Sequence, residues 1–275
     1  MADTIASAWQ RVLRRPAFLA LAGIFGCFVS SEATAVALIT LEQRHVKWGA
    51  LAYGRGAEIT YTFLREPLVD AEARNCRRMA PLEEALGPSG IGRAAFAVEV
   101  RAAFALWSDA ADVRFREVRE LEDAQIVIGA QAEPRRIAYA NITLGEARSE
   151  GITALDRATI CLNPLVDWIL DRDGNLETYH VRRVLAHEIG HAIGLDHPGP
   201  EGGIMGYRYV EPAEGPMAAL SAGDIAAITA LYGPRGGADP LIATTLPTDG
   251  TAAGAGQMTG RAFGERKKAR LPLGP

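Results

Sequence analysis

The feature that most constrains this chain is the sequence H-E-I-G-H at residues 187–191, followed by a glycine and a third histidine. Histidines four residues apart on a helix lie on one face about one turn apart, so both imidazoles can reach a single cation. Gly194 permits the positive φ that ends such a helix, and the returning chain brings a third histidine to the same cation. Three neutral nitrogens leave a fourth position open, which is typical of a catalytic zinc site. The predicted ligands are His187, His191 and His197.

Two neighbours of these ligands also have predicted roles. Glu188 follows the first ligand directly, so its carboxylate points beside the ligand face and can hold a water on the cation without binding the cation itself. This arrangement predicts Glu188 as the general base of a hydrolysis reaction. Met205 follows the third histidine closely in the chain. A thioether is a poor partner for zinc, so Met205 is predicted to form an apolar floor beneath the histidines.

The whole pattern, H-E-x-x-H-x-x-G-x-x-H followed by Met205, resembles the zinc-binding signature of the metzincin metalloendopeptidases. The short interval between the third histidine and the methionine is most similar to the matrixins, the group of the matrix metalloproteinases. Residues 220–233 are similar to the last helix of a matrixin catalytic domain. The resemblance extends from about Trp48 to Gly233 and is strongest from Cys161 onward.

This resemblance implies a fold and an activity. The expected fold is α+β: a twisted mixed five-stranded sheet with a packing helix, the zinc-site helix, a Met-turn and a C-terminal helix. The expected activity is that of a secreted, zinc-dependent endopeptidase, acting as a monomer on proteins such as those of the extracellular matrix. An extended peptide substrate would pair with the edge strand 137–144 and place its scissile carbonyl over the zinc. The competing interpretation is a zinc-containing module of the cell envelope, or one that binds peptides without cutting them.

Two tyrosines beyond Met205 are candidates for substrate contacts. Matrixins usually carry proline at the position of Tyr207, whereas astacins and serralysins have a tyrosine whose phenol can bind zinc. By this resemblance Tyr207 is a zinc ligand, a group that stabilises the oxyanion, or a residue of the substrate pocket, and the pocket is favoured. Tyr209 matches the tyrosine of the matrixin specificity wall, which places it beside the S1′ subsite.

Other polar features limit the metals and partners that the chain is expected to bind. The chain has five histidines, so the histidine-rich second zinc site of matrix metalloproteinases has no ligands here, and one zinc per chain is predicted. His180 would lie about 10 Å along the helix axis from His187, too far to share its metal, and is assigned an outer or surface position. Residues 171–175 resemble a calcium-loop fragment but lack its flanking acids, so a polar turn is favoured and calcium is unsupported. A net charge of −4 gives no reason to expect nucleic acid.

Periodicity outlines the rest of the domain. Apolar residues at helical spacing between Phe96 and Trp107 predict a helix whose aromatic side chains face the sheet. Residues 65–92 contain three prolines and are predicted to form an irregular surface excursion. Ser221 and Asp224 predict a capping box for the last helix. Three apolar side chains of that helix, Ile225, Ile228 and Leu231, are expected to pack inward. The predicted strands are 58–63, 113–118, 125–129, 137–144 and 158–162.

The two ends of the chain lie outside this domain, which is assigned to residues 36–234. Arginines, an apolar run over 17–29 and Ala33-Thr34-Ala35 have the order of a signal peptide, so residues 1–35 are predicted to be cleaved on export to the periplasm or the medium. The alternative is a membrane anchor over 17–40, which polar residues interrupt. Residues 235–275 have too little apolar pattern to fold alone and are predicted to be a flexible tail.

The cysteines leave a choice open. After cleavage Cys76 and Cys161 remain, and an oxidising compartment makes a disulfide between them possible. Such a bond would close a long loop and stabilise the fold by about 4 kcal/mol in the chain-entropy model. The competing idea is a reactive Cys76 thiolate, flanked by arginines, that blocks the zinc.

Overall fold

A computed structural model describes residues 36–71, 73–175, 177–199, 203–212 and 214–236. The predicted leader, residues 1–35, lies outside this range, and so does all but the first two residues of the predicted tail. Both assignments stay predictions. Among the described residues, no helix combines the length and the apolar character needed to cross a membrane.

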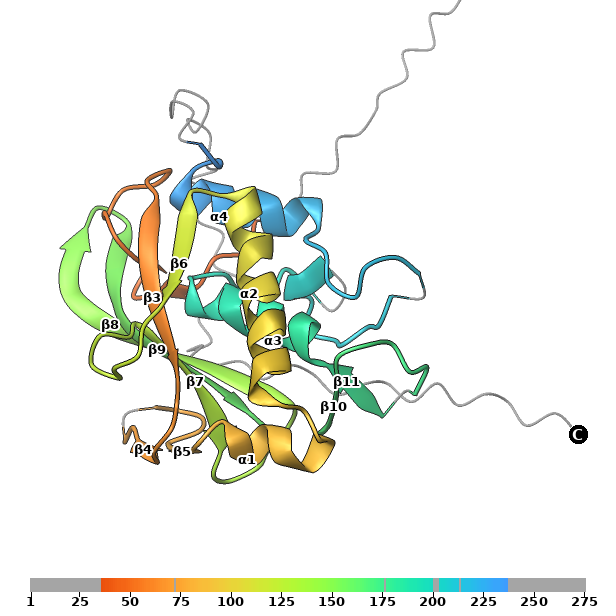
Figure 1. The fold of residues 1–275 in the computed structure, drawn as a ribbon. Helices are drawn as coiled ribbons and strands as arrows, with labels where there is room; N and C mark the ends of the chain where they lie inside the picture. Colours follow the sequence, from red (N-terminus) through yellow and green to blue (C-terminus); the bar gives the residue numbers. More distant parts are fainter. Residues whose placement is uncertain (1–35, 72, 176, 200–202, 213, 237–275) are drawn as a thin grey trace, which may run out of the picture. The chain divides into compact units, whose positions relative to one another are not determined.

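The centre of the fold is a sheet built on the five predicted strands (Figure 1). Four of them run parallel in the order β9, β7, β3, β6, and β8 pairs antiparallel with β9 at the other side. Parallel strands are covered on both faces, which is why every residue of β7 is buried and all but its last residue, Gln131, are apolar. The five strands are β3 (Ala57–Phe63), β6 (Val113–Glu117), β7 (Ile126–Gln131), β8 (Ala138–Ser149) and β9 (Ile152–Leu162).

The sheet is larger than the five strands that were expected. Within the described residues it has nine strands, because four short ones join its margins. The first two pair with each other, and the second also pairs in parallel with β9. The other two lie in the segment 65–92, and β5 pairs antiparallel with β7. The added strands are β1 (Thr40–Leu41), β2 (Arg44–Lys47), β4 (Leu68–Val69) and β5 (Arg78–Ala80).

The prediction that residues 65–92 form a mere surface excursion was wrong. Besides β4 and β5, this segment contains α1 (Glu83–Leu86) and the 3-10 turn η1 (Gly87–Ser89). Leu82 and Leu86 are buried in the main core. Pro67 and Pro81 lie between the short elements, and Pro88 lies in the first turn of η1, where a proline is tolerated, so these prolines are compatible with a packed segment.

Two long helices cover one face of the sheet. Figure 1 shows α2 (Arg93–Ala110) and α3 (Val181–Ala192) side by side, and the bidentate ion pair between Arg182 and Glu99 joins them. Phe96 and Phe104 of α2 face the sheet as predicted, with their rings against Phe63 and Tyr61. The remaining elements are the parallel pair β10 (Asp167–Ile169) and β11 (Thr178–His180), the 3-10 turn η2 (Gly203–Met205), and α4 (Ala222–Tyr232).

Trp107 is buried in the core, as predicted, and its Nε1 also donates a hydrogen bond to the Ala186 carbonyl of α3 at 3.0 Å. One side chain of α4 departs from prediction. Ile225, expected to pack inward, is 42% exposed, whereas Ile228 and Leu231 are fully buried. Ile225 is in the first turn of α4, and the apolar spacing alone assigned it to the wrong side.

A disulfide joins Cys76 to Cys161, across 85 residues of chain. Cys161 lies on β9, and alternate residues of a strand point to opposite faces, so this bond is on the face away from α2 and α3. It belongs to a small second cluster there, made by Leu64, Met79, Ala124, Val127, Tyr139 and Cys161. The competing idea of a free Cys76 thiolate is therefore excluded by the disulfide.

Candidate metal centre

The helix α3 brings two of the predicted ligands together. His187 and His191 lie one turn apart and are buried, and their Nε2 atoms are 3.2 Å apart. His197 places its Nε2 at 3.0 Å from that of His187 and 3.1 Å from that of His191. Three nitrogens at this spacing can all lie about 2.0–2.1 Å from one zinc ion. The donor set and its geometry therefore fit zinc with one side of the ion open.

The turn between the second and third ligands depends on one glycine. Gly194 has φ +104°, as the sequence predicted, and a Cβ there would lie 2.3 Å from the Val46 carbonyl oxygen. Any L side chain would meet both the unfavourable dihedral and this backbone atom. The backbone N–H of Leu195 then donates to the Gly190 carbonyl at 2.9 Å, which closes the end of the helix.

Backbone carbonyls fix the orientation of two imidazole rings. Nδ1 of His187 donates to the Ile204 carbonyl at 2.6 Å, and Nδ1 of His191 donates to the Leu195 carbonyl at 2.8 Å. With the proton on Nδ1, each Nε2 keeps its lone pair and points it inward. Burial and the two neighbouring imidazoles hold the pKa of His187 well below its ordinary value, so the ring stays in the neutral form that binds metal.

Glu188 lies beside the ligands and is fully buried. Burial raises the pKa of its carboxyl well above the ordinary value, and the backbone N–H of Ala140 on β8 acts in the opposite direction. Among the described residues, neither carboxylate oxygen completes a hydrogen bond of ordinary distance and angle. A buried carboxylate of this kind is costly unless a ligand or water partners it, which is the expected condition of a reactive group.

The turn that carries Met205 is held from beneath by an aspartate that sequence reasoning treated only as a helix cap. Asp224 accepts hydrogen bonds from the backbone N–H groups of Ile204 at 2.9 Å and Met205 at 3.2 Å. It also completes the predicted capping box with Ser221. The capping pattern identified Asp224 from the sequence as a helix cap. Its hydrogen bonds to the turn could not be identified in this way, because they depend on how the turn folds over α4.

Met205 itself is buried against the zinc helix. A Cβ at Gly190 would lie 2.3 Å from its sulfur and 3.0 Å from a ring carbon of Trp107. The thioether therefore occupies the place that a side chain on α3 would take. Two indoles missed by sequence reasoning also support this helix, since Trp107 and Trp48 donate from Nε1 to the carbonyls of Ala186 and Ala192.

Comparison with known families agrees with this geometry. The family model for matrixin matches residues 86–233, which is more than half of the chain and includes all three histidines. The chain belongs to the matrixin family. The matched region begins within α1, so β1 to β5 lie outside it.

Three curated relatives are similar to parts of this chain. Metalloendoproteinase 1-MMP of Arabidopsis thaliana is 31% identical over 142 residues, covering 49% of this chain and 37% of the relative. The hatching enzyme of Paracentrotus lividus is 29% identical over 163 residues, 54% of this chain and 24% of the relative. Interstitial collagenase of Sus scrofa is 40% identical over 60 residues, covering 22% of this chain and 12% of the relative. The matched part of this matrixin therefore spans less than two fifths of each relative.

The two tyrosines of the predicted pocket have different environments. Tyr207 is 39% exposed, and its ring centroid lies 6.1 Å from that of His197 in an edge-on arrangement. Tyr209 is buried, and its phenol oxygen accepts a hydrogen bond from the backbone N–H of His180 at 2.9 Å. The guanidinium of Arg183, one turn before His187, lies 5.8 Å from the Tyr209 ring. Tyr207 is thus open to solvent beside the ligands, whereas Tyr209 belongs to the wall behind them.

Two other polar features lie apart from the ligands. His180 is outside the histidine group, as predicted, but it ends β11 immediately before α3 instead of lying on the helix, and it is buried rather than on the surface. Residues 171–175 form the predicted polar turn, in which Gly174 has φ +74° and Asp173 Oδ1 accepts hydrogen bonds from Asn175 and Thr178. Neither feature adds a ligand to the zinc group.

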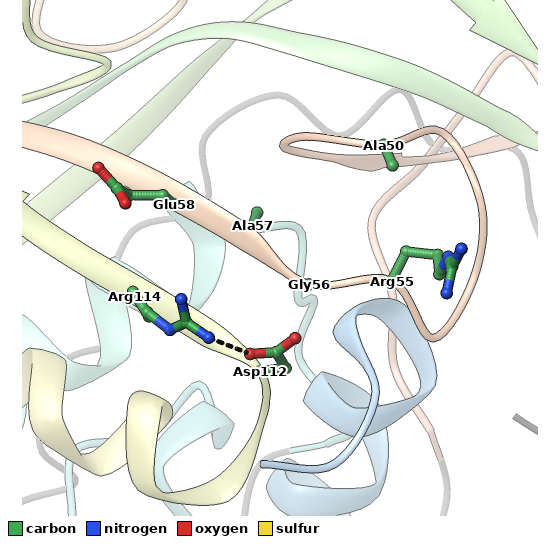
Figure 2. Close-up of a pocket in the computed structure, with 7 residues that line it drawn as sticks. All are labelled: Ala50, Arg55, Gly56, Ala57, Glu58, Asp112 and Arg114. Carbon is green, nitrogen blue, oxygen red and sulfur yellow. Dashed lines mark hydrogen bonds and ion pairs between the residues drawn. The ribbon is translucent and has the colours of Figure 1, made fainter. Parts of the chain in front are cut away.

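A hollow of about 370 Å³ lies elsewhere on the domain. Figure 2 shows that it is bounded by the turn before β3 and by the start of β6, where Arg114 pairs with Asp112. Below it, the buried ammonium of Lys47 donates to the carbonyls of Ala50 and Arg55. No residue of the zinc motif lines this hollow, so it is separate from the metal centre.

Proposed function

We propose that this chain is a zinc-dependent endopeptidase that hydrolyses peptide bonds in proteins. The observation that carries the proposal is the convergence of three Nε2 atoms, 3.0–3.2 Å apart, beside the fully buried carboxylate of Glu188. A structural zinc site uses four protein ligands, whereas three ligands with an adjacent free carboxylate are the arrangement of a hydrolytic site. Membership of the matrixin family supports the same reaction.

In this mechanism Glu188 is the general base and then the general acid. When bound, zinc polarises the peptide carbonyl and makes a neighbouring water more acidic. Glu188 accepts the proton of that water as its oxygen attacks the carbonyl, and then donates the proton to the departing amine. Burial raises its pKa, which suits a group that must hold a proton between the two steps. His187, His191 and His197 hold the metal, and Met205 in the proposed Met-turn packs below them.

The substrate is proposed to bind as an extended strand along β8. Among the described strands, β8 pairs with β9 alone, so its other edge is available. The Ala140 N–H on that edge faces Glu188, which puts the edge within reach of the reactive carboxylate. Peptides commonly bind in this way, because an added strand satisfies main-chain groups while its side chains enter separate pockets. Tyr207 and Tyr209 are proposed to line the pocket for the residue after the scissile bond, the S1′ subsite.

Replacement of Glu188 by Gln tests the proposal. The variant should bind one zinc per chain with wild-type affinity but cleave a quenched protein substrate at least about a hundredfold more slowly, since only the proton acceptor is lost. Glu84→Gln, at an exposed position on α1, is the matched control and should leave the rate unchanged. A Glu188→Gln variant with full activity would refute the assignment. Zinc binding and peptide binding without cleavage by the wild type would favour the non-catalytic module instead.

A further inference from the structure

A short stretch at the start of the described chain lies against the loop between the second and third ligands. The backbone N–H of Ile39 donates to the Gly194 carbonyl at 2.9 Å, and the N–H of Asp196 donates to the Ala37 carbonyl at 3.0 Å. Leu38 and Leu195 face each other as an antiparallel bridge. Residues 37–39 therefore pair with the loop as one strand pairs with another.

This loop determines the position of two zinc ligands. Its Leu195 carbonyl accepts the Nδ1 proton of His191 and so orients that ring. His197 follows directly after Asp196, and its backbone N–H donates to the Asp196 side chain at 2.7 Å. The groups bound by residues 37–39 belong to Gly194 and Asp196, which flank Leu195. A shift of this loop would therefore move one ring and the backbone of another.

The first half of the same loop is held differently. The Ile193 carbonyl accepts a hydrogen bond from the Tyr232 hydroxyl at 2.9 Å, and the Ala192 carbonyl accepts one from Trp48 Nε1 at 2.8 Å. Tyr232 and Trp48 are buried, and the backbone N–H of Trp48 donates a hydrogen bond to the Tyr232 hydroxyl at 3.1 Å. These anchors belong to the core and would remain if residues 37–39 left. Loss of residues 37–39 would therefore displace the second half of the loop, which leads to His197.

We propose that residues 37–39 are a positioning strand for the zinc ligands, so that zinc affinity depends on the chain immediately after the predicted leader. The inference rests on the zinc site of the proposed function. Cleavage after Ala35, as the sequence predicts, would leave the new N-terminus at Val36 and keep the strand complete. Further trimming by four residues would remove the strand and with it the hydrogen bond to Gly194. The length of the mature N-terminus thus sets how firmly the enzyme holds its metal.

The test compares Ile39→Pro with Ile39→Ala in the full chain. Both variants lose the isoleucine side chain, but only proline removes the N–H that donates to Gly194, and it still permits an extended residue before it. Zinc affinity is measured by competition with a chromogenic chelator. Ile39→Pro should bind zinc at least about tenfold more weakly than Ile39→Ala, the effect typical of losing a group that supports a metal ligand. Equal affinities in the two variants, with a wild type that binds zinc, overturn the inference alone.

A second measurement decides the question if the proline variant does not fold. Coupling is reciprocal, so a strand that strengthens zinc binding must itself be strengthened by zinc. In the wild type, zinc should slow hydrogen exchange at the Ile39 and Asp196 amides, while the Ala132 amide, bonded to Arg78 in the distant segment, stays unchanged. Zinc that protects α3 but leaves the Ile39 amide unaffected would overturn the inference. A wild-type chain that binds no zinc would overturn the proposed function as well.

Discussion

The two faces of the sheet are held together in different ways. On the face covered by α2 and α3, a large apolar core surrounds the histidines, and the loop after α3 is fixed by hydrogen bonds from both ends of the domain. On the other face, the segment 65–80 covers a cluster of six buried residues. A cluster of that size offers little apolar burial to offset the entropy of ordering the segment. The disulfide at Cys76 supplies the constraint that packing does not.

The two faces of the sheet therefore have different roles. The zinc side is organised by packing and by backbone hydrogen bonds, which position atoms within tenths of an ångström, as a metal requires. The disulfide side stabilises the fold, because a covalent link acts mainly by restricting the unfolded chain. Perturbing one face should therefore change metal binding, and perturbing the other should change the free energy of unfolding. Variants on each face test this separation.

The largest effect is expected from His191→Ala on the zinc face. Removal of one of three ligands should lower zinc affinity far beyond the tenfold to hundredfold that loss of a supporting group costs, and peptide cleavage should disappear with the metal. His45→Ala is the matched control, since His45 bonds to Tyr53 and lies outside the ligand group. Metal analysis of the purified proteins should give one zinc per chain for the control and none for His191→Ala. A full zinc complement in His191→Ala would contradict the ligand assignment.

The second largest effect is expected from a loss of stability on the opposite face, which carries the disulfide. Cys76→Ser breaks the disulfide at its partly exposed end and leaves Cys161 in its buried place. Closing a loop of this length is worth about 4 kcal/mol in the chain-entropy model, so urea-induced unfolding should show a loss of that order. Zinc affinity should stay within about twofold of the wild type, because residues 65–80 contribute nothing to the ligand loop. Loss of zinc in Cys76→Ser would show that the two faces are coupled.

What could be predicted from the sequence follows the same division. The proposed ligands, the proposed base and the turn at Gly194 are encoded within eleven residues, where helix periodicity and one positive φ determine which side chains meet. The packing of residues 65–92 depends on β7 and on Cys161, which are far away in the chain, and no local pattern specifies such pairings. Ile225 was assigned to the wrong side of α4 for a related reason. It fits the apolar spacing, but whether a side chain at that spacing is buried depends on the elements that pack against the helix.

The smallest effect, and the sharpest test of packing on the zinc face, concerns Gly190. Glycine inside a helix costs about 1 kcal/mol relative to alanine, so Gly190→Ala would stabilise α3 if space allowed. The new Cβ would lie 2.3 Å from the Met205 sulfur, however, and such overpacking costs about 1–3 kcal/mol. We therefore expect Gly190→Ala to lower the free energy of unfolding by about 1 kcal/mol. Gly92→Ala is the control, because its Cβ would meet no atom within 4 Å and its φ of −72° and ψ of 145° are open to alanine.

Combining Gly190→Ala with Met205→Ala separates the cost of the clash from the gain in helix propensity. Truncation of Met205 removes the sulfur that the new methyl would strike, so the clash disappears while the helix-forming advantage of alanine remains. In that background, Gly190→Ala should raise the free energy of unfolding, by up to about 1 kcal/mol, and so reverse its sign. Urea unfolding of the four proteins in this cycle measures the reversal. If Gly190→Ala destabilises both backgrounds equally, the contact with Met205 is not what requires glycine in the zinc helix, and the nearby ring of Trp107 becomes the limiting neighbour.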